Sequence, residues 1–223
     1  MLFRSGKSEV VEAIDAATGK TLWSDGHPTS FAPQVGGGDG PLCTPVIHDG
    51  RVIVFGAQGI LACLDLATGR RLWQRDTHRE FDAPEGYFGA GSTPLVVGGN
   101  VLVNVGGSRQ EAGIVAFDLG TGATKWKVTA EPASYSSPVK VDIGGVPHAL
   151  FVTRYQCLLV EAATGAVKWR FPFGMRGPTV NAATPLVMAA GDAAEKRLFV
   201  TAAYGIGSVN ASFDGQEIGR AHV

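Results

Sequence analysis

The side chains able to do covalent or metal chemistry are few and lie far apart in this sequence. The 223 residues include three cysteines and five histidines: Cys43, Cys63, Cys157, His27, His48, His78, His148 and His222. No Cys-x-x-Cys pair or short His spacing occurs, so the sequence predicts no metal site. No Ser-His-Asp set can be recognised either, so we predict no catalytic residue. We expect the cysteines to be small buried apolar side chains and the histidines to lie on the surface or in turns.

Aromatic and polar residues with recognition chemistry gather between the predicted strands. Tyr, Arg and Asn side chains anchor recognition surfaces, and binding residues concentrate in loops on rigid scaffolds. We therefore predict a candidate binding face made of Tyr87, Ser92, Arg109, Tyr135, Arg154, Asn181 and Tyr204, with Glu85, Phe88, Gln110, Glu111, Ser136, Tyr155 and Arg176 beside them. The competing interpretation is that each residue only caps a loop or a blade end.

The segments that must position these loops repeat one motif. Residues 13–23 read AIDAATGKTLW, and three further copies, CLDLATGRRLW, AFDLGTGATKW and LVEAATGAVKW, occupy 63–73, 116–126 and 159–169. All four tryptophans of the chain end a copy. The Thr-Gly glycines of successive copies are 43 to 53 residues apart. This period indicates a propeller or another repeat array.

Each conserved position of the motif copies has a predicted structural role. The aspartate accepts hydrogen bonds from the amides of a turn, and the glycine supplies the positive φ that a tight hairpin needs. The tryptophan packs against the neighbouring repeat. The predicted blade-docking residues are Trp23, Trp73, Trp126, Trp169, Gly19, Gly69, Gly122, Gly165, Asp15, Asp65 and Asp118. An aromatic ligand cage is the competing interpretation of the tryptophans, which we consider less favoured because every repeat has the same spacing.

Apolar, β-branched runs separated by Asp-Gly and Gly-Gly turns predict about four antiparallel strands per repeat, as in a propeller blade. We predict an all-β fold with a single propeller domain over residues 1–223. Complete blades are expected at 42–76, 92–129 and 136–172, and partial ones at 1–24, with one strand pair, and 183–223. Ser/Thr-Pro pairs are expected to open the first strands, where no ladder donor is needed. The array is interpreted as an incomplete arc of a larger ring; the alternative is that the two partial units form one composite blade.

Naming the strands of a blade a to d in chain order, the a→b and c→d turns are mostly short. The d→a and b→c connections are longer and more varied. In an antiparallel blade these two sets project from opposite faces, so we place the candidate binding face on the d→a and b→c side.

Composition narrows the class of partner. Charged residues make up 17%, the net charge is −1, and no basic run exists, so no surface for nucleic acid is expected. No apolar stretch has the length of a transmembrane helix. The first five residues show no signal-peptide pattern, and a repeat has already begun at Val10. We therefore expect a fragment of a longer protein.

The consensus A-x-D-x-x-T-G-x-x-x-W resembles the tryptophan-docking motif of the pyrroloquinoline-quinone (PQQ)-like β-propeller repeat family. The copies at 13–23 and 116–126 match it fully, the copy at 63–73 departs at one position, and the copy at 159–169 departs at two. The resemblance covers nearly the whole chain. With the GYFGAGS stretch at 86–92, it looks most like the uncharacterised bacterial members. It implies a periplasmic or extracytoplasmic location.

The resemblance implies a fold but leaves the activity open. The family includes quinoprotein alcohol dehydrogenases, which use PQQ with Ca²⁺, and a non-enzymatic outer-membrane assembly lipoprotein. The dehydrogenases carry a vicinal disulfide beside the cofactor, and no two cysteines are adjacent here. We expect a non-catalytic binding or assembly scaffold for a protein, peptide or carbohydrate partner. The alternative is a fragment of a PQQ- and Ca-dependent quinoprotein alcohol dehydrogenase, with a hydrolase domain fused elsewhere as a weaker third hypothesis.

Overall fold

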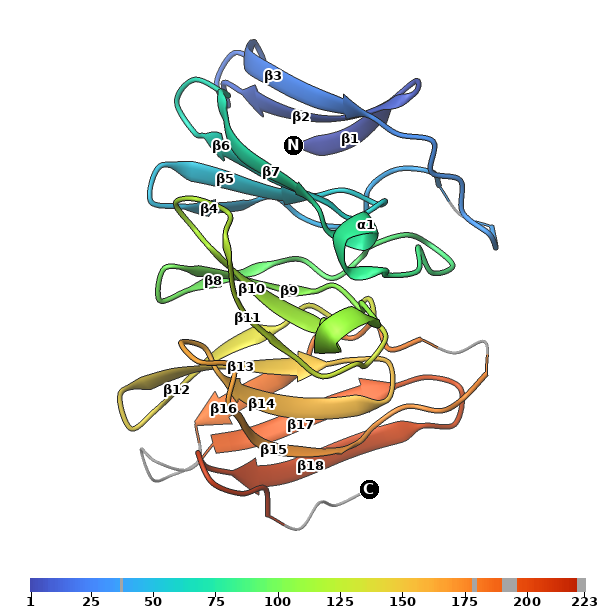
Figure 1. Ribbon diagram of the computed structural model, residues 1–223, viewed down its shortest axis with the longest axis vertical. Coiled ribbons are helices and arrows are strands. Elements are labelled where there is room, and N and C mark those ends of the chain that lie inside the picture. Colours follow the sequence, from blue (N-terminus) through green and yellow to red (C-terminus); the bar gives the residue numbers. More distant parts are fainter. Residues whose placement is uncertain (37, 178–179, 190–195, 220–223) are drawn as a thin grey trace.

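Five antiparallel sheets follow one another along the chain (Figure 1). The computed structural model describes residues 1–36, 38–177, 180–189 and 196–219. The first sheet contains β1 (Leu2–Ser5), β2 (Ser8–Ile14) and β3 (Thr21–Pro28), and the second contains β4 (Val46–His48), β5 (Arg51–Phe55), β6 (Ile60–Asp65) and β7 (Arg71–Asp76). The third contains β8 (Leu95–Val97), β9 (Asn100–Asn104), β10 (Ile114–Asp118) and β11 (Thr124–Val128). The fourth contains β12 (Val139–Ile143), β13 (Val146–Val152), β14 (Gln156–Glu161) and β15 (Val167–Pro172), and the fifth contains β16 (Leu186–Ala189), β17 (Lys196–Ala202) and β18 (Gly207–Phe213).

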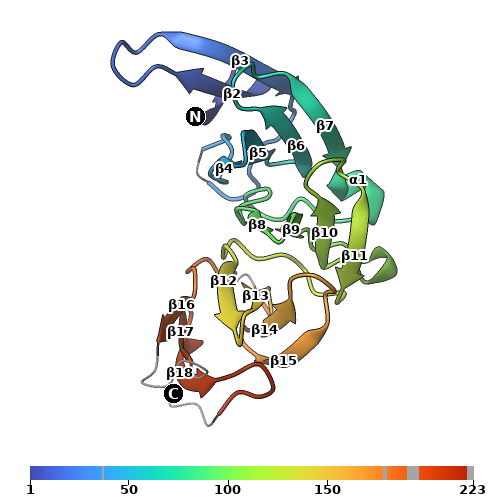
Figure 2. The ribbon, with the colours of Figure 1, turned by 90° about the vertical axis from the view of Figure 1, so that its left-hand side faces the viewer.

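The sheets are arranged as the blades of a propeller arc. Strands that are neighbours in sequence pair within each sheet, and the sheets succeed one another along a curve (Figure 2). The first strands β4, β8, β12 and β16 lie on the inner side of this curve, and the fourth strands β7, β11 and β15 lie on its outer side. The predicted all-β fold, with three four-stranded blades flanked by two partial ones, is confirmed.

Two features of the strands differ from the prediction. The first unit holds three strands instead of one pair, because β2 pairs with β1 on one side and with β3 on the other. The pairing of β2 with β3 extends as far as Ser8 opposite Pro28. The first strands of the later blades begin after the proline of each Ser/Thr-Pro pair, so the hydroxyl residue lies outside the strand.

The helices and histidines also differ from the prediction. A five-residue helix, α1 (Thr77–Phe81), and a 3-10 turn, η1 (Arg109–Glu111), occupy connections that the strand pattern left irregular. The prediction that the histidines lie on the surface or in turns is wrong for His148 in β13, which is 3% exposed, and for His27 in β3, which pairs with a buried glutamate. His222 and the predicted end of the last unit, 220–223, lie outside the described residues.

The core forms between successive blades, which explains why the middle strands read as continuous apolar runs. Every residue of β9 is buried, as are the first four of β10, because both faces of each inner sheet are covered by a neighbouring blade. One cluster joins Phe55 of the second blade to Val103 and Phe117 of the third. The three cysteines are free and buried, as predicted, and burial raises the pKa of Cys63 to about 11.

Each tryptophan of the motif docks on the blade that follows. The indole Nε1 groups donate to backbone oxygens of the next c→d turn: Trp23 to Leu66 (2.8 Å), Trp73 to Leu119 (3.0 Å), Trp126 to Ala162 (3.2 Å) and Trp169 to Asp214 (3.2 Å). The first three rings also lie directly over the Thr-Gly glycine of that turn. A Cβ atom on Gly69, Gly122 or Gly165 would be 2.6–2.7 Å from the indole. Each glycine therefore serves both the turn and the indole of the preceding blade.

The motif aspartates organise the turn on which each indole docks. Asp118 Oδ1 accepts hydrogen bonds from Thr121 Oγ1 at 3.0 Å, from Thr121 N at 2.9 Å and from Gly120 N at 3.0 Å. The Thr121 hydroxyl and then the Thr121 amide hold the pKa of Asp118 below its usual value. Asp15 and Asp65 make the same bonds to Thr18 and Thr68.

Replacing Thr121 with valine should raise the pKa of Asp118 toward the ordinary aspartate value of about 3.9. A lowered carboxyl pKa adds stability that is present above the unfolded-state value and is lost as the pH falls through the folded-state value. The Thr121→Val protein should therefore lose less stability on acidification than the parent. A ¹³C NMR titration of the side-chain carboxyls would measure the pKa, with Asp65 as the internal control that should not move. An unchanged Asp118 midpoint would contradict the role of the threonine.

Candidate binding site on the loop face

The two ends of the blades carry different kinds of connection. The d→a and b→c connections, including α1 and η1, lie on the right-hand side in Figure 1, and we call this side the loop face. The a→b hairpins and the c→d turns of the docking motif lie on the other side, the turn face. All residues of the predicted binding face come from connections of the loop face, although not all of them reach its surface.

Tyr135 lies against glycines from the d→a connection of the blade before it. A Cβ atom on Gly91 would be 2.4 Å from the Tyr135 ring, and one on Gly86 would be 3.2 Å from its hydroxyl. Phe88 N donates to Tyr135 Oη at 2.9 Å, and the two rings meet edge to face with centroids 5.6 Å apart. Burial raises the pKa of Tyr135, so the phenol keeps its proton at neutral pH. The glycine-rich 86–91 segment thus fixes a proton donor in place.

Arg154 is presented by the short β13–β14 connection and lies over two aromatic rings. Its guanidinium carbon lies 5.9 Å from the centre of the Tyr87 ring and 5.6 Å from that of Tyr155. Nη2 donates to Gly177 O at 2.9 Å, whereas the buried Nε has no hydrogen-bond partner. Stacking on aromatic faces restricts the guanidinium without neutralising its charge.

The carboxylate of Glu131 holds the connection that carries Arg154. It accepts hydrogen bonds from Tyr155 N and Thr153 Oγ1, both at 3.3 Å, and from Gln156 Nε2 at 3.1 Å. Its oxygens are therefore committed to the turn. Within the chain segments that the structure describes, Arg154 forms no ion pair.

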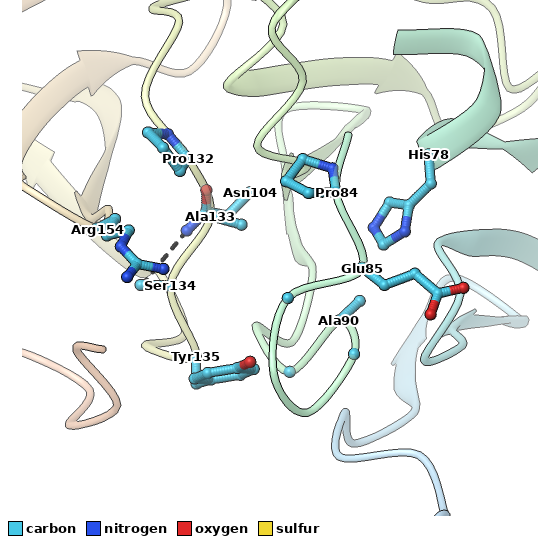
Figure 3. A pocket seen from close by; sticks show the side chains of 13 residues that line it. His78, Pro84, Glu85, Ala90, Asn104, Pro132, Ala133, Ser134, Tyr135 and Arg154 are labelled. Atoms are coloured by element: carbon cyan, nitrogen blue, oxygen red, sulfur yellow. Dashed lines mark hydrogen bonds between the residues drawn. The ribbon is translucent and has the colours of Figure 1, made fainter. Parts of the chain in front are cut away.

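Arg154 and Tyr135 line one cavity between the second, third and fourth blades (Figure 3). Its volume is about 50 Å³. Asn104, at the end of β9, is 2% exposed, and its Oδ1 has no partner, while Nδ2 is 3.5 Å from Ser134 Oγ. His78 forms part of the wall, and its Nδ1 also lacks a partner. A group of buried polar atoms without partners in one cavity is unusual for a folded protein and indicates a bound ligand or water.

Helix α1 positions His78 at this wall. The carboxylate of Asp76 accepts a hydrogen bond from Arg79 N at the start of the helix, and Thr77 Oγ1 donates to Gly59 O at 2.8 Å. The imidazole meets the Phe55 ring edge to face, with centroids 6.2 Å apart. Burial lowers the pKa of His78, so the ring is neutral at pH 7. Arg154 is then the cation of the cavity wall.

Two residues predicted for the binding face are buried within the loops. Asn181 is 1% exposed, and its Nδ2 donates to the backbone oxygens of Thr153, Arg154 and Phe173. Ser92 is also 1% exposed, and its hydroxyl donates to Ser136 O at 2.8 Å. Both side chains tie connections together and are not available to a partner at the surface.

Two other predicted residues lie on the surface but outside the cavity. Tyr204 is 62% exposed and borders a wider apolar hollow that also includes Leu42, Phe88 and Tyr135. The Arg109 side chain is 65% exposed and lies 3.6 Å from Asp82 Oδ2. The structure thus brings Tyr87, Tyr135 and Arg154 together, places Tyr204 beside them, and leaves Arg109 apart.

Sequence reasoning missed a set of hydroxyl hydrogen bonds between successive blades. Ser136 Oγ donates to Ala183 O at 2.9 Å, as Ser92 does to Ser136, and Ser137 Oγ accepts from Thr93 N at 3.1 Å. The signal was present in the recurring hydroxyl residues before proline. The sequence pattern assigns Thr93 and Ser137 to strand starts, and Ser92 and Ser136 to the binding face, whereas in the structure all four link successive blades.

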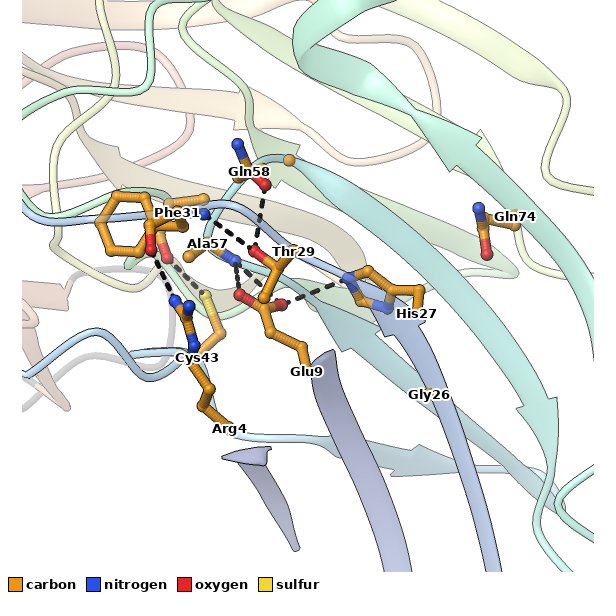
Figure 4. A network of polar contacts seen from close by, with 12 residues as sticks. Arg4, Glu9, Gly26, His27, Thr29, Phe31, Cys43, Ala57, Gln58 and Gln74 are labelled. Carbon is orange, nitrogen blue, oxygen red and sulfur yellow. Dashed lines mark hydrogen bonds and ion pairs between the residues drawn. The ribbon is translucent and has the colours of Figure 1, made fainter. Parts of the chain in front are cut away.

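A buried carboxylate joining the first two blades was missed as well (Figure 4). Glu9 is 1% exposed, and its two oxygens accept from Ala57 N at 3.0 and 3.2 Å, with His27 Nε2 at 3.3 Å. Nothing in the sequence near Glu9 marks it, because its partners lie on another strand and on the next blade.

The described residues do not fit PQQ with Ca²⁺. Among them, no three His, Cys, Asp or Glu side chains lie close enough together to hold a metal ion. The cavity at Arg154 is smaller than the several hundred Å³ that drug-sized ligands occupy. The wider hollow beside it, of about 730 Å³, is lined by Ala, Val, Leu, Thr and aromatic residues with no cation for a polycarboxylate. No helix in the described part is long and apolar enough to cross a membrane.

Comparison with known families identifies the repeat. Residues 7–218 match the PQQ_2 family model, which is described as "Outer membrane protein assembly factor BamB". The chain belongs to this family. The resemblance inferred from the tryptophan-docking motif is therefore confirmed, and the PQQ-like family accounts for nearly the whole chain.

The relatives of this PQQ-like chain include both enzymes and an assembly factor. It is 29% identical over 147 residues to the quinohemoprotein alcohol dehydrogenase of Comamonas testosteroni, covering 62% of this chain and 20% of that protein. It is 33% identical over 138 residues to the 1-butanol dehydrogenase (cytochrome c) of Thauera butanivorans, covering 58% of this chain and 18% of that protein. The chain thus spans about a fifth of the length of the curated relatives it matches.

A solved structure shares the fold of this PQQ-like chain. BamB from Moraxella catarrhalis superimposes with a TM-score of 0.65 at 18% identity, covering 99% of this chain and 60% of that one. At this identity the similarity concerns the fold alone.

Proposed function

We propose that this PQQ-like propeller is a non-catalytic binding or assembly scaffold that holds its partner on the loop face. The observation that carries the proposal is the convergence of Tyr135 and Arg154 on one cavity, with Tyr87 against Arg154. Three buried polar atoms of the cavity lining have no partner: Arg154 Nε, Asn104 Oδ1 and His78 Nδ1. Aromatic and arginine side chains of this kind anchor recognition surfaces. Among protein, peptide and carbohydrate partners we favour a protein, because the matching family model is described as an outer membrane protein assembly factor. We place the chain in the periplasm for the same reason.

The test compares two pairs of exposed apolar residues on opposite faces. On the loop face, Leu42 is 52% and Tyr204 62% exposed; on the turn face, Leu22 is 66% and Ile47 64% exposed. The immobilised protein is incubated with a bacterial envelope extract, and retained proteins are cross-linked and identified. The Leu42→Ser/Tyr204→Ser variant should lose the partner, whereas Leu22→Ser/Ile47→Ser should retain it. Equal retention by both variants would overturn the loop-face assignment.

A quinone-dependent alcohol dehydrogenase is the second candidate, favoured by the named activities of the two sequence relatives. The full-length protein is incubated with PQQ and Ca²⁺, and alcohol-dependent dye reduction is followed. The scaffold proposal expects neither saturable quinone binding nor dye reduction. Observing both would replace it with the dehydrogenase function.

A further inference from the structure

Among the residues that the structure describes, no carboxylate forms an ion pair with the guanidinium of Arg154. Its Nε is buried and has no partner, its Nη2 bonds to a neutral backbone oxygen, and its guanidinium carbon lies over the Tyr87 and Tyr155 rings. The carboxylate of Glu131 is committed to the β13–β14 turn. The Arg154 side chain is half-buried, so solvent still reaches part of the guanidinium, whereas its buried Nε–H donor has no acceptor, which costs free energy. The Nε–H donor and the positive charge of Arg154 are therefore available to a ligand.

The other groups of the cavity wall define the chemistry of that group. Tyr135 Oη accepts from Phe88 N, and no described residue accepts the proton of its hydroxyl. His78 is neutral because burial lowers its pKa, so it adds no second charge. Glu85 Oε1 accepts from Gln58 Nε2 at 2.6 Å, and Figure 3 shows its carboxylate directed away from Arg154. Arg154 and Tyr135 line the same cavity, and a cation and a hydroxyl donor are groups that bind a carboxylate.

The size of the cavity limits the ligand to a small group. A volume of about 50 Å³ corresponds to a few water molecules, at roughly 10–15 Å³ each. It admits a carboxylate and one or two carbons but not a ring system. The Asn104 amide, buried at the back with an unpartnered Oδ1, supplies an acceptor for an N–H or O–H next to that carboxylate.

We propose that the cavity between Arg154, Tyr135 and Asn104 binds a single carboxylate group. Its source is either a small free carboxylic acid or the C-terminus of a chain that lies along the apolar hollow of Leu42, Phe88 and Tyr204, which shares Tyr135 with the cavity. This inference rests on the proposed function, because it names the group that the loop face recognises.

The test uses three probes with the full chain: sodium acetate, a tripeptide ending in phenylalanine with a free C-terminal carboxylate, and the same tripeptide as its C-terminal amide. The Arg154 Nε–H resonance of ¹⁵N-arginine-labelled protein is followed during titration. The tripeptide acid should shift it saturably and bind about tenfold or more tightly than the amide, since the amide loses the charge-assisted hydrogen bonds. Equal binding of the tripeptide acid and its amide would overturn the proposal. If neither acetate nor the tripeptide acid shifts the resonance, the proposal is also wrong, and water alone fills the cavity.

Matched variants locate the binding. Arg154→Gln removes the cation and should weaken the binding of the acid about tenfold or more, measured by calorimetry. Arg109→Gln makes the same change on the same face but outside the cavity, and should bind like the parent. Tyr135→Phe keeps the ring against Gly91 and removes only the hydroxyl, so it should weaken binding without loss of folding. If Arg154→Gln does not fold, Tyr135→Phe and the acid–amide pair still decide the question. Equal weakening by Arg109→Gln would contradict the site.

The probes also separate the two sources and the two proposals. Acetate binding as tightly as the tripeptide acid indicates a free small carboxylic acid, whereas a tripeptide acid that binds about tenfold more tightly indicates a chain terminus. If no carboxylate binds but Leu42→Ser/Tyr204→Ser still loses its partner, the carboxylate site is wrong and the scaffold function stands. If the Leu42→Ser/Tyr204→Ser variant retains the partner and acetate binds to the parent, the scaffold function on the loop face is wrong and the carboxylate site stands.

Discussion

Replacing Trp73 with alanine should lower the free energy of unfolding by about 3 kcal/mol or more. Truncation of a buried tryptophan typically costs about 3–5 kcal/mol. We expect the lower end because the ring of Trp73 is only partly buried. The change also removes the hydrogen bond to Leu119 O at 3.0 Å and uncovers Gly122. Chemical denaturation followed by circular dichroism measures the effect.

Leu22→Ala is the matched control for Trp73→Ala. Leu22 is an apolar residue of β3, the strand that carries the docking Trp23, but it is 66% exposed and should contribute little. Because blades contact only their neighbours, loss of an internal interface should also broaden the transition or divide it in two. If Trp73→Ala were no more destabilising than Leu22→Ala, the docking role of the indole would be wrong.

Replacing Gly122 with alanine should destabilise the protein by about 2–5 kcal/mol. The φ of Gly122 is +71°, a conformation that costs other residues about 1–2 kcal/mol. The new Cβ would also be 2.7 Å from the Trp73 indole, and the displacement needed to relieve such an overlap typically costs about 1–3 kcal/mol. Denaturation of the variant and the parent under the same conditions measures the sum of the two effects.

Gly98→Ala separates the two causes. Gly98 has a φ of +58° and no atom within 4 Å of an added Cβ, so it should show the conformational cost alone. In the parent protein, we expect Gly122→Ala to lower the free energy of unfolding by about 1–3 kcal/mol more than Gly98→Ala does. In the Trp73→Ala background, we expect the two substitutions to have the same effect. The same excess in both backgrounds would show that the indole does not set the requirement for glycine at this position.

The repeated motif made most of the fold predictable. A tryptophan, a glycine and an aspartate at fixed positions are local signals, and the hydrophobic alternation between them marks strands. Strand β1 of the first sheet was missed because it is short and only its pairing with β2 identifies it. Helix α1 was missed because five residues are too few to show a helical period.

The site was less predictable than the fold. The choice of the loop face follows from connection length, and it includes Tyr87, Tyr135 and Arg154. Ser92 and Asn181 were included on residue type, yet their hydrogen bonds are internal. Asn104 and His78 were not included, because one ends a strand and the other begins a helix whose packing the sequence does not show.

What the sequence by itself determined is the repeat: a four-stranded unit, its turns, and an indole that needs a glycine on the next unit. These follow from interactions within a few residues and from a period that any copy reveals. Only the tertiary structure decided which side chains meet. Arg154, Tyr135 and Asn104 come from connections and strands of different blades, and the curvature of the arc brings them to one cavity. Whether a polar atom ends paired or unpaired there depends on the packing of blades against one another, for which no local pattern exists.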